Sequence, residues 1–264
     1  MAKRVGVLLS GCGRLDGSDV AETMLALLVI ERAGAQAICF APDADQAGVV
    51  NHLTGEASDG ARNARVEAAR IAGSVRPLAE LNANAIDALI VPGGEGPIAT
   101  LSDYPEKREL CQIHPEVAGL LRGMLQSRRP MGFFGLSALF AARVLGPAAG
   151  VRLTVGPKTL PFAKHAAVMG ADVRPCALED VIVDQKSRVY STPGFLAEGA
   201  RLAGVARAVD RLVRAVVANA KDRAPAPSPL PVESAGPATR PGARPATGLS
   251  GAAGAATGRG RGSA

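Results

Sequence analysis

Short apolar runs alternate with amphipathic stretches along the first 222 residues. The runs are four or five residues long and rich in Val, Leu, Ile and Phe, which is typical of strands buried on both faces. They predict strands at 5–9, 36–40, 88–91, 130–134 and 151–155. The intervening stretches predict helices at 18–33, 62–72, 115–128, 137–145, 163–170 and 195–220, with a hairpin at 181–183 and 189–191.

This alternation favours an α/β fold with a mostly parallel sheet and helices on both of its faces. The first helix has clear end signals, because Ser18 is a residue type that caps helices and Gly34 one that ends them. Ligands in such folds bind beyond the carboxyl ends of the strands. The segments that follow the strands are therefore the place to look for a site.

Composition divides the chain after residue 222. Residues 223–264 hold seven Pro, eight Gly and five Arg against one Glu. Such a segment buries too little apolar surface to fold by itself, so we predict one domain, residues 1–222, followed by a disordered tail. Arginine-containing tails can bind RNA. Five dispersed arginines favour an inert extension instead, which makes tail-mediated binding of nucleic acid the least favoured function.

The formal net charge of +6 comes largely from this tail, because the body carries 25 Lys and Arg against 23 Asp and Glu. No apolar stretch reaches the roughly 18 residues that a membrane-spanning helix needs, and the first residues lack the pattern of a signal peptide. The four cysteines form no CxxC pair, which argues against a metal site or a disulfide framework. We expect a cytoplasmic protein with reduced thiols and with no membrane contact, metal or cofactor.

Three segments that follow strands carry candidate chemistry. Residues 11–17 read GxGxxxG, one residue longer than the dinucleotide fingerprint, so nicotinamide or flavin binding is not predicted. The glycines at 93–94 can present backbone N–H groups to an anion or oxyanion, or simply form a turn. Gly135 lies between a strand and a helix, which is the place of the nucleophile in an elbow motif.

Several motifs together resemble one known family. They are Val-Gly-Val-Leu-Leu-Ser-Gly-Cys-Gly (5–13), Asp-Gly-Ser (16–18), Phe-Ala-Pro-Asp (40–43), Asn-His-Leu-Thr-Gly-Glu (51–56), Val-Pro-Gly-Gly (91–94), Ile-Val-Asp (182–184) and Thr-Pro (192–193). In this order they resemble the ElbB-type proteins, glyoxalase-like members of the ThiJ/PfpI, class I glutamine amidotransferase-like superfamily that are linked to isoprenoid biosynthesis. The resemblance implies a flavodoxin-like three-layer α/β sandwich and a homodimer.

The resemblance also implies a site. The family's helix glutamate falls on Glu22, and its oxyanion turn falls on Gly93 and Gly94, with the N–H of Leu136 as the second donor. The elbow cysteine falls on Gly135, because this chain reads Gly-Phe-Phe-Gly-Leu-Ser-Ala where the family reads Gly-Phe-Met-Cys-Ile-Ala-Pro. The thiol that would attack the substrate is therefore absent.

The missing thiol sets the expected function. In the family's mechanism a thiolate attacks an α-oxoaldehyde, and Gly135 has no side chain with which to do so. We expect a non-catalytic or weakly active relative that binds a small carbonyl or anionic ligand or acts as a scaffold. The oxyanion turn is also altered, with Glu95 and Ala99 where the family has an apolar residue and a lysine.

The alternative is an active glyoxalase or lyase on small α-oxoaldehydes such as methylglyoxal. It would use Glu22 together with Cys12 or with an activated water, although Cys12 is more simply interpreted as a small buried residue. Two physical expectations accompany the site. A carboxyl of Glu22 in a pocket should have a raised pKa, and Gly135 should adopt the positive φ of an elbow without strain.

Overall fold

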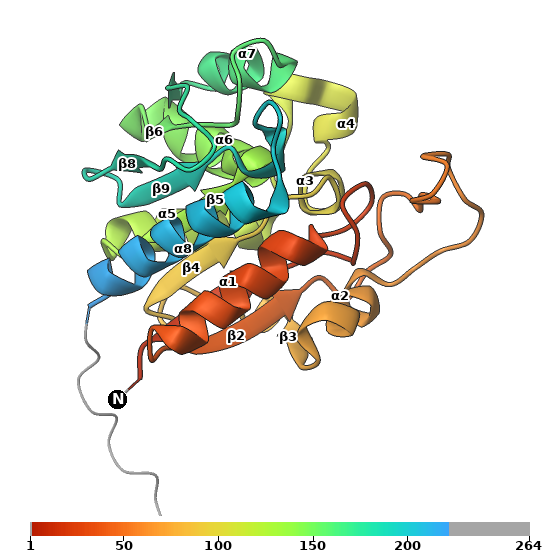
Figure 1. Ribbon diagram of the computed structural model, residues 1–264, viewed down its shortest axis with the longest axis horizontal. Helices are drawn as coiled ribbons and strands as arrows, with labels where there is room; N and C mark the ends of the chain where they lie inside the picture. Colours follow the sequence, from red (N-terminus) through yellow and green to blue (C-terminus); the bar gives the residue numbers. More distant parts are fainter. Residues whose placement is uncertain (1, 222–264) are drawn as a thin grey trace, which may run out of the picture. The chain divides into compact units, whose positions relative to one another are not determined.

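A seven-stranded sheet forms the centre of the computed structural model, which describes residues 2–221 (Figure 1). Its strand order is β3-β2-β1-β4-β5-β9-β8, and each neighbouring pair is parallel except β8 and β9. The strands are β1 (Arg4–Leu8), β2 (Gln36–Ala41), β3 (Val75–Pro77), β4 (Ala88–Val91), β5 (Met131–Phe134), β8 (Ile182–Asp184) and β9 (Val189–Thr192). A separate two-stranded sheet holds β6 (Arg152–Leu153) and β7 (Asp172–Val173).

Helices cover both faces of the sheet. One face packs against α1 (Val20–Arg32), α2 (Ala64–Ala72) and α8 (Leu202–Asn219). The other packs against α3 (Gly96–Thr100), α4 (Tyr104–Lys107), α5 (Pro115–Gln126), α6 (Ala138–Ala149) and α7 (Pro161–Val168). Single turns of 3-10 helix occur at Leu78–Glu80, Arg108–Leu110, Gly135–Ser137 and Gly194–Leu196. The three-layer α/β sandwich predicted from the sequence is therefore confirmed.

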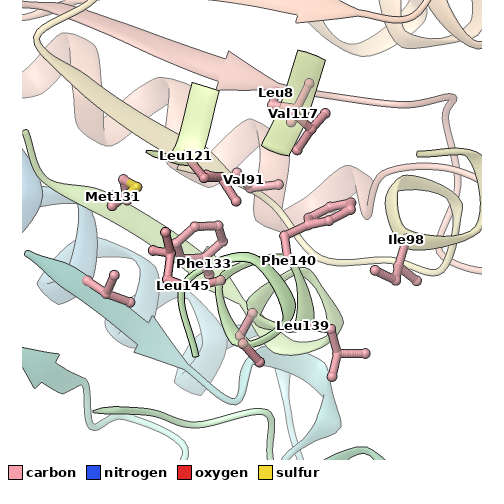
Figure 2. Close-up of a cluster of buried hydrophobic side chains, with 14 of the residues drawn as sticks. Leu8, Val91, Ile98, Val117, Leu121, Met131, Phe133, Leu139, Phe140 and Leu145 are labelled. Atoms are coloured by element: carbon pink, nitrogen blue, oxygen red, sulfur yellow. The ribbon is translucent and has the colours of Figure 1, made fainter. Parts of the chain in front are cut away.

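The strands supply both cores because successive side chains of a strand point to opposite faces. In β1, Val7 is buried against the α1 and α8 side, and its neighbour Leu8 is buried against the α5 and α6 side. Figure 2 shows the second of these cores, to which Phe133 of β5 and Leu145 of α6 both belong. Each such side chain contributes about 1.5–3 kcal/mol of hydrophobic stabilisation.

The long elements lie where the sequence predicts them, and the corrections concern their ends. Helix α1 begins at Val20 and is capped by Asp19, whose Oδ1 accepts the N–H of Glu22 at 3.0 Å. The predicted cap, Ser18, instead accepts the N–H of Ser10 through its hydroxyl at 2.9 Å and so holds the end of β1. The sequence shows two neighbouring residues able to cap a helix, and only the tertiary contact decides between them.

Two predicted elements differ more. The segment predicted as a helix from 195 to 220 is a 3-10 turn at Gly194–Leu196 followed by α8 from Leu202. The strand predicted at 151–155 is shortened to β6 and lies outside the main sheet. In both cases the apolar pattern predicts the right type of element, but the element is shorter than predicted because the ends of the segment do not continue it.

The predicted tail at 223–264 lies outside the described residues. Among residues 2–221, no helix is both long enough and apolar enough to span a bilayer.

Candidate functional site

The carboxyl ends of β1, β4, β5 and β9 converge on one small pocket with a volume of about 40 Å³. Glu22 reaches it from the first turn of α1, and the turn after β4 brings Gly93 and Gly94. The elbow after β5 brings Gly135 and Leu136. The remaining lining residues are Arg14, Asp19, Glu95, Phe195 and Leu196. The predicted site residues thus lie together, with the exception of Cys12.

Backbone hydrogen bonds fix the turn after β4 against the loop that follows β1. The carbonyl of Gly93 accepts the N–H of Asp19 at 2.9 Å, and the carbonyl of Arg14 accepts the N–H of Glu95 at 2.8 Å. Because Gly94 has a φ of +94°, the chain turns back here in a conformation that favours glycine. The start of α1 and the glycine turn are therefore held as one unit.

The carboxyl group of Glu22 is buried and held from two sides. Glu22 is only 2% exposed to solvent. Oε2 accepts the N–H of Gly93 at 2.8 Å, and Oε1 accepts the N–H of Phe195 at 3.1 Å. A Cβ at Gly93 or at Gly194 would collide with these carboxyl oxygens. The two glycines therefore leave the space that the carboxyl occupies.

The pKa of Glu22 is raised to about 7, the direction predicted for a carboxyl in a pocket. Burial is the main cause, because it removes water from the charged form. The negative charge of Asp19 raises the pKa further, while the two N–H donors and the guanidinium of Arg14 lower it. Near neutral pH the carboxyl therefore exists in both forms, so it can either accept or donate a proton.

The elbow has the backbone geometry that the sequence predicts. Gly135 has a φ of +52° and directly follows β5. The hydroxyl of Ser137 donates to the carbonyl of Val91 at 2.7 Å, which ties the elbow to the end of β4. The side chain of Ser137 is buried and does not line the pocket.

Backbone N–H groups at the pocket differ in their availability. The N–H of Gly93 is occupied by the carboxyl of Glu22. The N–H groups of Gly94 and Leu136 form no hydrogen bond with the residues that the structure describes. Both residues line the pocket, so these N–H groups are candidates for binding an oxygen atom of a ligand, whereas the N–H of Gly93 already binds Glu22.

Cys12 does not line this pocket. Burial and the nearby negative charge of Glu67 raise the pKa of its thiol above the ordinary value. A raised pKa leaves less thiolate at neutral pH, and the thiolate is the reactive form. The environment of Cys12 is thus unlike that of an activated nucleophile.

Five lining residues were not predicted as site residues, and one of them, Glu95, was expected only as a change in the glycine turn. Arg14 follows β1 and could have been predicted, because ligands in such folds bind beyond the ends of the strands. Asp19 is a recognisable helix cap, but its position beside Glu22 depends on the turn. Phe195 and Leu196 follow β9, and only the pairing of β9 with β5 brings them to the elbow. The guanidinium carbon of Arg14 lies 5.5 Å from the centre of the Phe195 ring, within the range of a cation–π contact.

Within residues 2–221, no group of three or more His, Cys, Asp and Glu side chains is arranged to hold a metal ion. The pocket residues themselves offer carboxyl groups, a guanidinium and backbone N–H groups. Such an arrangement suits a small polar ligand that carries a carbonyl or carboxylate oxygen.

Comparisons with known proteins give both relatives and structural neighbours. No family model matches the chain. The chain is 37% identical over 209 residues to the human "glutamine amidotransferase-like class 1 domain-containing protein 3, mitochondrial", which covers 75% of this chain and 77% of that protein. It is 36% identical over 205 residues to the rat "ES1 protein homolog, mitochondrial", covering 74% and 76% of the two chains.

Among solved structures, an isoprenoid biosynthesis protein with an amidotransferase-like domain from Ehrlichia chaffeensis superposes with a TM-score of 0.77. It is 28% identical and covers 83% of this chain and 99% of its own. A ThiJ/PfpI domain protein from Brachyspira murdochii has a TM-score of 0.52 at 14% identity, covering 83% of this chain and 96% of its own. The second likeness bears on the fold alone.

Proposed function

The chain belongs to the family of glutamine amidotransferase-like class 1 domain proteins that includes the ES1 homologues, and from this premise we propose a role in binding rather than covalent catalysis. Its resemblance to the ElbB-type proteins is confirmed by the relatives and by the Ehrlichia structure. The proposed ligand is a small molecule with a carbonyl or carboxylate group, bound in the pocket around Glu22. The protein would bind it without forming a covalent bond.

One observation carries this proposal: the elbow position is occupied by Gly135 at a φ of +52°. A covalent glyoxalase mechanism begins when a thiolate adds to the aldehyde carbon. A hydrogen atom in place of a side chain offers no electron pair for that step. In comparable hydrolases, loss of the nucleophile lowers the rate on the order of 10⁴–10⁶-fold.

The pocket residues indicate the kind of ligand. The N–H groups of Gly94 and Leu136 are donors without a partner among the described residues, and they suit an oxygen atom with negative charge. Arg14 adds positive charge at the same pocket, beside the carboxyl groups of Asp19, Glu22 and Glu95. The pocket volume of about 40 Å³ favours a small ligand. We therefore propose a small carbonyl compound or 2-oxo acid as the ligand class.

The alternative, an active glyoxalase, draws less support. Cys12 does not line the pocket, and its thiol pKa is raised rather than lowered. A pathway through a water molecule activated by Glu22 needs no thiol, and Glu22→Gln would abolish it. Nucleic-acid binding by residues 223–264 stays the least favoured function.

Two further expectations remain proposals. A homodimer follows from the resemblance. A cytoplasmic location follows from the sequence pattern, whereas the names of the human and rat relatives describe those proteins as mitochondrial.

Titration of the protein with pyruvate in a calorimeter tests the proposed binding. We expect saturable binding that Arg14→Ala weakens by about tenfold, which corresponds to the loss of about 1.4 kcal/mol of charge-assisted interaction. Glu31→Gln removes a carboxylate from the exposed far end of α1 and serves as the matched control. Absence of binding, or binding that both variants leave unchanged, would contradict the proposed site.

A further inference from the structure

The pocket retains a set of groups that is complete for a reaction needing no nucleophile. Abstraction of a proton next to a carbonyl requires a base at the carbon and hydrogen-bond donors at the oxygen that becomes negative. This pocket is lined by the carboxyl of Glu22 and by Gly94 and Leu136, whose N–H groups form no hydrogen bond with the described residues. The replacement of the elbow thiol by a hydrogen atom removes none of these three groups.

We propose that this pocket catalyses proton transfer between adjacent carbons of small α-hydroxycarbonyl compounds. The substrates would be hydroxyaldehydes and hydroxyketones of about three carbons, interconverted through an enediolate. This inference rests on the proposed function, because the same pocket must first bind a small carbonyl compound.

The reaction is an isomerisation, and its atoms balance without a co-reactant. Glu22 removes a proton from the hydroxyl-bearing carbon, and the electron pair of that C–H bond forms the carbon–carbon double bond of the enediolate. The carbonyl oxygen takes the negative charge and accepts hydrogen bonds from Gly94 and Leu136. Glu22 then returns a proton to the former carbonyl carbon, while the hydroxyl proton moves from one oxygen to the other.

The carboxyl of Glu22 is held in a fixed position at the pocket. Both of its oxygens are fixed by backbone N–H groups, at 2.8 Å from Gly93 and 3.1 Å from Phe195. Gly93 and Gly194 allow this close approach because each lacks a Cβ. A carboxyl group that is held in place loses little conformational freedom when the substrate binds, which favours reaction.

The charge of the site supports the same chemistry. Burial and the negative charge of Asp19 raise the pKa of Glu22 to about 7, against the opposite effect of the two N–H donors and of Arg14, which makes it a stronger base than an ordinary carboxylate. A base with a pKa near the working pH is both ionised in part and strong enough to take a proton from carbon. The rate should therefore rise as the pH increases through about 7 and level off above it.

Exchange of substrate hydrogen for deuterium tests this proposal directly. Dihydroxyacetone is incubated with the full-length protein in D₂O, and deuterium incorporation at carbon is followed by NMR. We expect incorporation above the protein-free rate, lowered at least about 10²-fold by Glu22→Gln. Cys12→Ser, which changes a thiol outside the pocket, is the matched control and should leave the rate unchanged.

Two results separate this inference from the proposed binding function. Binding of pyruvate and of dihydroxyacetone without deuterium incorporation would overturn the isomerase proposal and leave the binding function intact. Absence of binding for both compounds would overturn both. Incorporation that Glu22→Gln leaves unchanged would also overturn the isomerase proposal, because the base would then be another group.

Discussion

At the scale of single residues, Gly135 decides what the elbow can do and how well it folds. Its φ of +52° lies in the left-handed region, which residues with a Cβ adopt at a cost of about 1–2 kcal/mol. A Cβ here would also lie 3.2 Å from the carbonyl oxygen of Pro193 and 3.3 Å from the side chain of Leu196. A cysteine at this position therefore has to be supported by rearrangement of the neighbouring turn.

Restoring the thiol should lower stability. We expect Gly135→Cys to reduce the free energy of unfolding by about 1–2 kcal/mol, and Gly135→Ala to have a similar effect, because both add a Cβ at positive φ. Gly150→Ala is the control for crowding: Gly150 has a φ of +58° but open space around its Cβ position, so this variant should show the loss due to positive φ alone. Denaturant unfolding measures all three. A Gly135→Cys protein as stable as the parent would refute the argument from strain.

Glu22 should make stability depend on pH. Its folded pKa of about 7 lies above its ordinary value of 4.5, so the folded state holds the proton more tightly. The stabilisation that comes from this tighter proton binding is fully present below pH 4.5 and is lost as the pH rises through about 7. The stability of the parent relative to Glu22→Gln should thus fall by an amount on the order of 3 kcal/mol over this range. A constant difference across the range would show that Glu22 is not desolvated.

At the scale of elements, the start of α1 couples helix stability to the charge of the site. Asp19 caps the helix through Oδ1, and its negative charge also raises the pKa of Glu22. One side chain therefore performs two roles that a suitable pair of substitutions separates.

Asp19→Ala and Asp19→Asn distinguish these roles. The alanine variant removes the cap and should lower the free energy of unfolding by about 1 kcal/mol, whereas asparagine can still cap and should lower it less. Both variants remove the negative charge, so both should lower the pKa of Glu22. Denaturant unfolding measures the stability, and NMR titration of the Glu22 carboxyl measures the pKa. Equal losses of stability in the two variants would contradict the capping role.

Elements with a strong local pattern were predictable from the sequence, and short ones were not. The run Ala88–Val91 matches β4 at both ends because four consecutive apolar residues are bounded by an aspartate and a proline. In contrast, β3 has three residues, Val75–Pro77, and gains its strand form by pairing with β2. The short helix α3, Gly96–Thr100, contains Gly and Pro, which weaken any helical pattern.

At the scale of the whole molecule, topology turns separate motifs into one pocket. The order β1-β4-β5-β9 within the sheet brings residues near 22, 93, 135 and 195 together at the carboxyl ends of these strands. The resemblance to a family implied the first three of these positions. Phe195 and Leu196 were missed because their role depends on β9 lying beside β5, a pairing between residues more than 50 positions apart in sequence.

The rate at which methylglyoxal is consumed by the parent protein, Cys12→Ser and Glu22→Gln tests the central claim most directly. If the elbow offers no thiol and no other cysteine replaces it, the consumption of methylglyoxal does not depend on a thiol. The rates of the parent and Cys12→Ser are then equal. Consumption by the parent that Cys12→Ser and Glu22→Gln each abolish would contradict the account and assign a covalent glyoxalase mechanism to Cys12.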